Sequence, residues 1–167
     1  FPNIKLTAIL ASIRDEQRMM SIMQEFHPFA VFHAAAYKHV PLLEEFPTEV
    51  VKTNVEGTCN VVKAAIKCGA HKFVMVSSDK AVNPTNLMGA SKRIAEMIVQ
   101  HYGSNSNMNA ITTRFGNVLG SNGSVVPIFK KQIEAGGPVK VTHPEITRYF
   151  MTIPEASTLV IEAGTMG

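Results

Sequence analysis

Cysteine and long apolar runs are scarce in this sequence. Only two cysteines, Cys59 and Cys68, occur among 167 residues, which argues against a disulfide framework and favours a reducing, cytoplasmic setting. No apolar run approaches the ~18 residues of a membrane span, and no signal-peptide pattern opens the chain. We therefore expect no membrane contact from this chain.

Runs of one charge sign are also missing. The formal net charge is +3, and the basic residues are scattered, which is typical of a solvated surface and not of a nucleic-acid-binding face. His33, His39 and His143 have no carboxylate or cysteine at ligand spacing, so we expect no metal site. These absences leave a globular protein that acts on something other than nucleic acid.

The sequence does contain a regular alternation of strand and helix patterns. The apolar run 73–76 predicts a buried strand, Asn83-Pro84 marks a loop, and helical spacing begins at Met88. The other expected strands are 1–12, 29–36, 110–115 and 139–142, and the other expected helices are 14–26, 49–66, 125–135 and one from 154 onward. This alternation predicts one α/β domain with a doubly wound, mostly parallel, Rossmann-like sheet.

Glycine is absent from the start of the chain, where the first glycine is Gly57. A dinucleotide-binding sheet of this class normally carries a glycine-rich turn after its first strand, because backbone amides there hold a pyrophosphate. Residues 1–56 contain no such turn. We therefore expect an N-terminally truncated domain, a piece of a larger protein whose first strand and helix precede this chain.

Polar residues collect where the central strand ends. Ser78, Asp79 and Lys80 follow the strand directly, at the edge where open α/β sheets bind ligands. Met88 and Lys92 are four residues apart and share a helix face that can look back at that edge. Taken alone, an Asp-Lys pair in a turn is more typical of an exposed surface.

Six segments together resemble one enzyme family. The chain is similar to the nucleotide-sugar 4,6-dehydratases of the extended short-chain dehydrogenase/reductase superfamily, in the branch associated with bacterial polysaccharide biosynthesis. One such motif would be weak, but six in the same order cover most of the chain. The segments are S-I-R-D (12–15), V-F-H-A-A-A-Y-K-H-V-P-L-L-E (31–44), T-N-V-E-G-T (53–58), V-S-S-D-K-A-V-N-P-T-N-L-M-G-A-S-K (76–92), R-F-G-N-V-L-G-S-N-G-S-V (114–125) and T-H-P-E-I-T-R-Y-F-M (142–151).

The resemblance implies a reaction and its catalytic residues. The family oxidises carbon 4 of a nucleotide-linked hexose with a nicotinamide cofactor, eliminates water across carbons 5 and 6, and returns the hydride to carbon 6. By motif position Asp79 matches the acid and Lys80 the base of the elimination. Ser78 and Lys92 match the family's hydroxyl and lysine of the redox site.

Met88 departs from the superfamily pattern, which usually has tyrosine at this position. A thioether cannot exchange a proton, so Met88 cannot act as the base of the redox step. Members of this branch that commonly carry an N-terminal membrane region also have methionine here. We hypothesise that Ser78 and an ordered water polarised by Lys92 replace the missing phenol.

The resemblance also implies the ligand contacts. Ala34, Ala35 and Ala36 match positions along an NAD or NADP cofactor, Lys92 would hold its ribose, and Asp15 falls near its adenine. The substrate, a uridine diphosphate sugar of the N-acetylglucosamine type, would meet elements from about residue 117 onward. Its phosphates would contact Asn117 and Arg148, the latter as a bidentate donor.

Two other functions fit the same residues. A nucleotide-sugar epimerase on this fold would also use nicotinamide, but it has no need of the Asp79-Lys80 pair. Alternatively, the chain is a non-catalytic fragment that folds and binds no dinucleotide, which the missing glycine turn supports. We expect a homo-oligomer in either enzymatic case.

Overall fold

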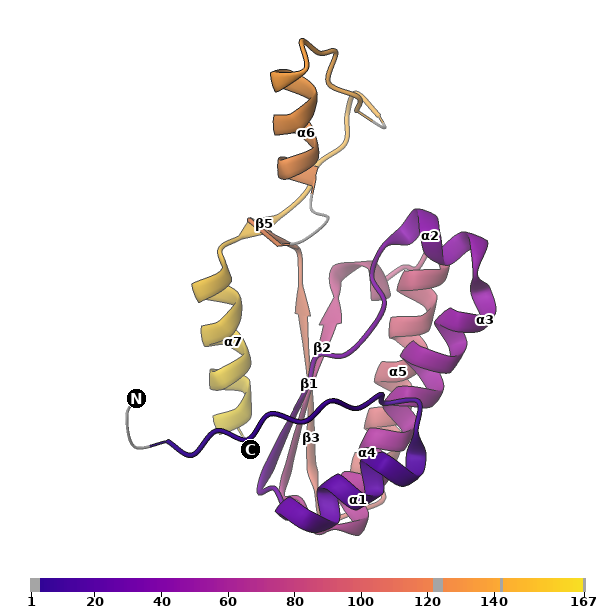
Figure 1. The fold of residues 1–167 in the computed structure, drawn as a ribbon, viewed down its shortest axis with the longest axis vertical. Helices are drawn as coiled ribbons and strands as arrows, with labels where there is room; N and C mark the ends of the chain where they lie inside the picture. The colour runs from indigo at the N-terminus through magenta and orange to yellow at the C-terminus, as the bar shows by residue number, and fades with distance from the viewer. Residues whose placement is uncertain (1–3, 122–124, 142, 167) are drawn as a thin grey trace.

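A three-stranded parallel sheet forms the centre of the computed structural model, which describes residues 4–121, 125–141 and 143–166 (Figure 1). Its strands are β1 (Ala30–His33), β2 (Lys72–Ser78) and β3 (Asn109–Phe115), in the order β1-β2-β3. All pairs are parallel, with Val31 opposite Phe73 and Phe73 opposite Ala110. The predicted α/β fold with a parallel sheet is confirmed.

Helices cover both faces of this sheet. Helices α1 (Glu16–Phe26), α4 (Gly57–Lys67) and α5 (Leu87–Ser104) form a layer on one face, and α7 (Ile153–Thr165) lies on the other (Figure 1). The main core is packed between β2 and the α4/α5 layer, because the apolar sides of both helices point at a strand that is covered on both faces. Its fully buried members include Val62, Ala64, Ala65, Phe73, Met75 and Ala95.

The predicted helix 49–66 is longer than expected and changes its geometry part of the way along. It comprises α3 (Pro47–Val50), the π-helical turn η1 (Val51–Glu56) and α4 in one continuous run. Gly69 adopts a φ of 76° just beyond the last turn, as a left-handed cap requires. A π-helical turn inserts an extra residue into the helix and is frequent at functional sites.

A smaller unit projects from the end of the sheet where the strands terminate (Figure 1). It contains a two-stranded parallel pair, β4 (Asn117–Val118) with β5 (Phe150–Met151), and helix α6 (Val125–Glu134). Two further short elements border the same end, α2 (Val40–Glu45) and the 3-10 turn η2 (Asp79–Ala81). The projecting unit begins at Asn117, and substrate-binding elements are expected from about this residue onward.

Two predicted strands are wrong. Residues 4–12 form no strand although their apolar side chains alternate, and Leu6 and Leu10 are exposed. Alternation stabilises a strand only when a neighbouring strand satisfies its backbone, and none lies beside this segment in the described part of the chain. Residues 139–141 likewise form no strand. The remaining residues of these two predictions, 1–3 and Thr142, lie outside the described ranges.

Helix α7 is capped at its start and fastened to the sheet at its end. A capping box closes its start, where Thr152 and Glu155 exchange hydrogen bonds. At its other end, the Lys72 ammonium donates to the carbonyl of Gly164 at 2.9 Å and the Asn109 amide donates to the carbonyl of Met166 at 3.2 Å. Across the described ranges, no helix has the length and apolar character needed to cross a membrane.

Candidate active site

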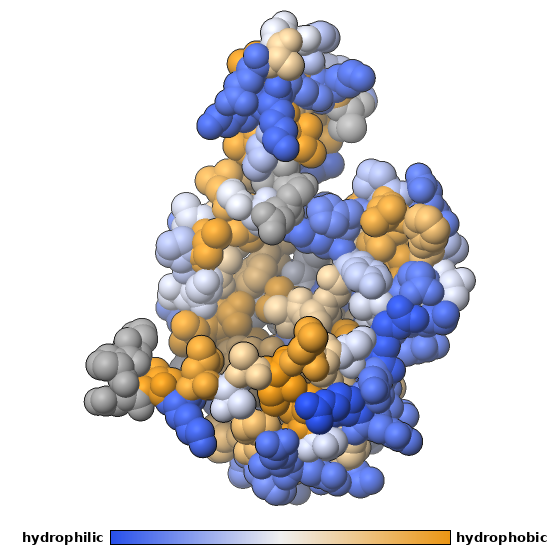
Figure 2. Space-filling model, viewed as in Figure 1, coloured by the Kyte–Doolittle hydropathy of each residue, from blue (hydrophilic) through white to orange (hydrophobic). Residues whose placement is uncertain are grey.

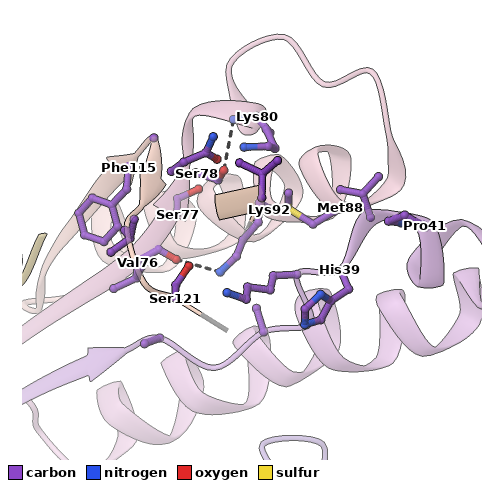
Figure 3. Close-up of a pocket in the computed structure, with 18 residues that line it drawn as sticks. His39, Pro41, Val76, Ser77, Ser78, Lys80, Met88, Lys92, Phe115 and Ser121 are labelled. Atoms are coloured by element: carbon purple, nitrogen blue, oxygen red, sulfur yellow. Dashed lines mark hydrogen bonds between the residues drawn. The ribbon is translucent and has the colours of Figure 1, made fainter. Parts of the chain in front are cut away.

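A cavity of about 450 Å³ opens at the carboxyl ends of β1 and β2, where the projecting unit meets the sheet. Figure 2 shows a corresponding hollow in the middle of the face turned to the viewer, and its walls are mainly apolar. Four stretches of chain form its walls: the loop after β1, the end of β2, the first turns of α5, and the segment around β4 (Figure 3). Its polar lining residues are Lys38, His39, Ser77, Ser78, Lys80, Lys92, Asn117 and Ser121.

Lys92 provides the buried charge of the cavity. It is 8% exposed, and its ammonium donates a hydrogen bond to the carbonyl of Val76 at 2.8 Å (Figure 3). Burial lowers the pKa of Lys92 from 10.5 to about 8, although the nearby Glu96 carboxylate opposes this shift. The ammonium is therefore held at the cavity wall at a free-energy cost, with two further N–H donors available to a ligand.

Ser78, Asp79 and Lys80 form one hydrogen-bonded cluster at the end of β2. The Ser78 hydroxyl donates to Asp79 Oδ1 at 3.0 Å, and the Lys80 ammonium donates to the same oxygen at 3.0 Å. Burial disfavours the Asp79 carboxylate, but the hydrogen bonds from Lys80 and Ser78 outweigh it and lower the pKa of this carboxyl. Asp79 is thus ionised at neutral pH and can accept a proton through Ser78.

The start of α5 is held close to this cluster by Gly89. A Cβ on Gly89 would overlap the carbonyl oxygen of Lys80, so only glycine allows this approach. Met88 lies one residue earlier and is 5% exposed. It packs against Leu43 and Val50 and also lines the cavity, so its thioether serves both packing and the shape of the site.

His33, at the end of β1, lies behind the cavity wall and is neutral. Its Nε2 lies 2.9 Å from the Thr58 hydroxyl, whose own hydrogen is donated to the Asn54 carbonyl at 2.7 Å. We therefore assign the proton to Nε2 of His33, with Thr58 as acceptor. Burial, and secondly the Lys92 charge, lower the pKa of His33 to about 4.

Acidification should therefore destabilise the protein through His33. The unfolded chain binds the proton with a pKa of 6.5 and the folded chain with a pKa of about 4, so stability is lost as the pH falls through this window. We expect a loss of about 2 kcal/mol between pH 7 and about pH 5, measured by urea unfolding. His33→Gln should lack this loss, and the exposed His101→Gln should retain it; equal pH slopes for His33→Gln and wild type would contradict the assignment.

The cavity brings together most of the residues that the sequence predicts for the site. Ser78, Lys80, Met88, Lys92, Asn117, Ala34 and Ala36 line it, and Asp79 is joined to it through Ser78 and Lys80. Three predicted contacts lie elsewhere. Ala35 is exposed outside the lining, Asp15 caps α1 by accepting from the Arg18 amide, and Arg148 donates to the carbonyl of Thr147.

The sequence reasoning missed Lys38 and His39 as lining residues. Both follow the three alanines directly, and the signal that could have found them was their place after the end of a parallel strand. Among the residues that the structure describes, no group of three or more His, Cys, Asp or Glu side chains could hold a metal ion. The cavity thus offers hydroxyl, amine and amide groups to a ligand.

Comparison with known proteins supports a shared family. Residues 2–167 match a family model described as polysaccharide biosynthesis protein. The capsular polysaccharide biosynthesis protein CapD of Staphylococcus aureus is 56% identical over 98% of this chain and 27% of its own length. UDP-N-acetylglucosamine 4,6-dehydratase (inverting) of Campylobacter jejuni is 37% identical over 91% of this chain and 46% of its own length. UDP-glucose 4-epimerase of Rickettsia canadensis is 41% identical over 90% of this chain and 46% of its own length.

Solved structures share the fold. Pen from Bacillus thuringiensis aligns with a TM-score of 0.91 and 39% identity, over 99% of this chain and 52% of that one. UDP-glucose 4-epimerase of Thermus thermophilus, solved in complex with NAD, aligns with a TM-score of 0.80 and 22% identity, over 94% of this chain and 60% of that one. The chain thus spans about half of these proteins, and about a quarter of CapD.

Proposed function

The chain belongs to the polysaccharide biosynthesis protein family, and from this premise we propose that it forms the catalytic part of a nucleotide-sugar 4,6-dehydratase. The observation that carries the proposal is the cluster in which Ser78 and Lys80 both donate to Asp79 beside the buried Lys92. A dehydratase needs an acid and a base next to the redox site. An epimerase needs neither member of the Asp79-Lys80 pair.

The residues present fit the nicotinamide end of an NAD or NADP cofactor. Ala34 and Ala36 leave room beside the strand ends, and Lys92 can donate to ribose hydroxyls from the cavity wall. When bound, the cofactor would accept a hydride from carbon 4 and return it to carbon 6. The glycine turn for its pyrophosphate is not in this chain, so we propose that a longer protein supplies it.

We propose that Ser78 and Asp79 take the place of the phenol that Met88 cannot provide. Because the Ser78 hydroxyl already donates to Asp79, it can receive the proton of the carbon 4 hydroxyl while it passes its own proton to the carboxylate. Lys92 stabilises the negative charge that develops on the sugar oxygen. This relay leaves Asp79 protonated, as the later elimination requires of an acid.

Lys80 then acts on carbon 5. Protonation of Asp79 removes the negative charge that pairs with the Lys80 ammonium at 3.0 Å, which favours release of the lysine proton to solvent water. Neutral Lys80 removes the carbon 5 proton, and protonated Asp79 gives its proton to the departing carbon 6 hydroxyl. Water leaves, and a carbon–carbon double bond conjugated to the carbon 4 ketone forms. When the hydride returns to carbon 6, the Lys80 ammonium gives its proton back to carbon 5.

Product analysis tests the proposal. The protein of full natural length, incubated with UDP-N-acetylglucosamine and NAD, should yield a 4-keto-6-deoxy sugar that is 18 mass units lighter by loss of water, detected by mass spectrometry. Recovery of a carbon 4 epimer of unchanged mass would instead support the epimerase. Tight binding of NAD by the present chain in a titration would exclude a fragment that binds no dinucleotide.

Met88→Leu should retain activity within about threefold, because the exchange preserves volume and the proposed relay does not use the thioether. Met88→Ala is a poorer probe of chemistry: this side chain is buried against Leu43 and Val50, and its truncation should cost about 2–3 kcal/mol. The measurement is kcat for dehydration beside the unfolding free energy. A Met88→Leu protein that folds normally and is inactive would show that the sulfur has a chemical role.

A further inference from the structure

Helix α5 carries a buried carboxylate one turn beyond Lys92. Glu96 is 5% exposed, and residues four apart on a helix lie on the same face. Lys92 and Glu96 therefore both point at the sheet, where the Lys92 ammonium donates to the Val76 carbonyl at 2.8 Å. A buried carboxylate is costly unless it is paired and hydrogen-bonded, so the partners of Glu96 decide whether it stays charged.

Arg114 of β3 holds Glu96 with two parallel hydrogen bonds. Its Nε donates to Glu96 Oε1 at 2.9 Å and its Nη2 to Oε2 at 2.6 Å, which is the strong bidentate geometry of an arginine–carboxylate pair. Arg93 Nη1 donates to Oε2 at 3.2 Å. Burial raises the pKa of Glu96, but the side chains of Arg114, Ser77 and Arg93 outweigh it and lower this pKa. Glu96 is thus a fixed negative charge inside the fold at neutral pH.

The pairing of β2 with β3 places this ion pair next to the reactive end of β2. Ser77 lies opposite Arg114 and Ser78 lies opposite Phe115. Helix α5 is therefore bound to the sheet at two successive turns, by Lys92 to β2 and by Glu96 to β3. Together the two contacts fix the position of the Lys92 ammonium relative to Ser78.

Other charges around Lys92 are unsuited to balance it. In the described ranges, the titratable and charged groups around Lys92 are His33 at the end of β1, Lys38 and His39 in the loop that follows, Asp79 and Lys80 after β2, and Glu96 on α5. Lys38 and Lys80 carry the same sign of charge as Lys92, and His33 is neutral. Asp79 is already paired with Lys80. Glu96 is thus the carboxylate that favours the charged form of Lys92.

We propose that Glu96, held by Arg114, is a positioning residue that keeps Lys92 as an ammonium at the cavity wall. The catalytic consequence rests on the proposed function, in which this ammonium stabilises the charge on the sugar oxygen. Burial lowers the pKa of Lys92 to about 8, against the opposing effect of Glu96. Without the carboxylate, Lys92 would release its proton at a lower pH, and the sugar oxygen would lose its cation.

An NMR titration of the Lys92 side chain in the present chain tests the proposal. Glu96→Gln preserves the volume and one oxygen acceptor for Arg114 but removes the charge, so the titration midpoint of Lys92 should move about 1 pH unit lower. Arg114→Met breaks the same ion pair and leaves the carboxylate, so it should not lower the midpoint. Glu162→Gln makes the same chemical change at an exposed position of α7 and should leave the midpoint unchanged.

The pH dependence of kcat in the full-length protein gives a second readout. At pH 8, kcat should be about fivefold lower in Glu96→Gln than in wild type, because less of Lys92 is protonated. At pH 6 the two values should agree, since Lys92 carries its proton in both proteins. A purely structural role would instead lower kcat by the same factor at every pH, and that result would overturn the proposal.

A double variant keeps the proposal testable if Glu96→Gln does not fold. Glu96→Met combined with Arg114→Met replaces both partners of the ion pair by apolar side chains, which is often neutral for stability, and it should also lower the Lys92 midpoint. An unchanged midpoint in a folded Glu96→Gln, or an equal fall in Arg114→Met, would overturn the positioning role. A wild-type full-length protein that performs no dehydration would overturn the proposed function, and the NMR titration would still decide whether Glu96 keeps Lys92 charged.

Discussion

Lys92→Met should make the protein more stable and, in the full-length enzyme, inactive. Lowering of the Lys92 pKa from 10.5 to about 8 corresponds to about 3 kcal/mol of destabilisation by the buried charge at neutral pH. Loss of the hydrogen bond to Val76 offsets about 1 kcal/mol of the gain. We therefore expect a net increase of about 2 kcal/mol in unfolding free energy, while kcat falls about 1000-fold because the developing oxyanion loses its nearest cation.

The pH dependence provides an independent check on Lys92. Between pH 8 and 10.5 the unfolded chain retains the lysine proton and the folded chain releases it, so wild-type stability should rise with pH across this window. Lys92→Met should lack that rise, whereas the exposed Lys67→Met should keep it. Urea unfolding at several pH values measures both. A variant that is less stable than wild type at every pH would contradict the buried-charge argument.

Asp79→Asn and Lys80→Met should stop the reaction at different points. Asparagine cannot receive the Ser78 proton, so Asp79→Asn should slow both carbon 4 oxidation and elimination by about 1000-fold. Lys80→Met removes only the proposed base for carbon 5. It should oxidise carbon 4 and accumulate a 4-keto hexose that keeps its carbon 6 hydroxyl.

Rapid quench followed by mass spectrometry separates these outcomes, because the accumulated sugar differs in mass from the dehydrated product. Exchange of the carbon 5 proton with deuterated solvent gives a second readout, which Lys80→Met should abolish. Lys38→Met is a suitable comparison, since Lys38 lines the same cavity but lies outside the Ser78-Asp79-Lys80 cluster. Carbon 4 oxidation at the wild-type rate in Asp79→Asn would rule out the relay through Ser78.

The parts of the fold that could be predicted are those with strong local patterns. The apolar run after Lys72 suits a strand covered on both faces and forms one. Asn86 caps α5 by accepting from the Gly89 amide, two residues before the expected start. Residues 4–11 carry an equally regular strand pattern and form none. Whether such a segment pairs depends on a neighbour that local sequence does not encode.

The candidate site also has parts that the sequence predicts and parts that depend on packing. Motif order placed Ser78, Lys80 and Lys92 in one cavity, because parallel strands and the helix that follows them share an edge. It did not predict that Asp79 is the shared acceptor of Ser78 and Lys80. Nor did it predict that the Asn54 side chain bonds to Tyr37 and Ser91, which are distant in sequence. Such contacts emerge only when the elements pack.

The order of the sheet has a consequence for handling the isolated chain. β1 and β3 each pair on one side only within the described ranges, so both outer strands present backbone groups that can join another chain. β3 carries the charged side chain of Arg114 at this edge, which discourages such joining. β1, with the sequence A-V-F-H, carries no such charge and is the edge most exposed to aggregation. A covering segment or a lysine there would favour a soluble, monodisperse preparation.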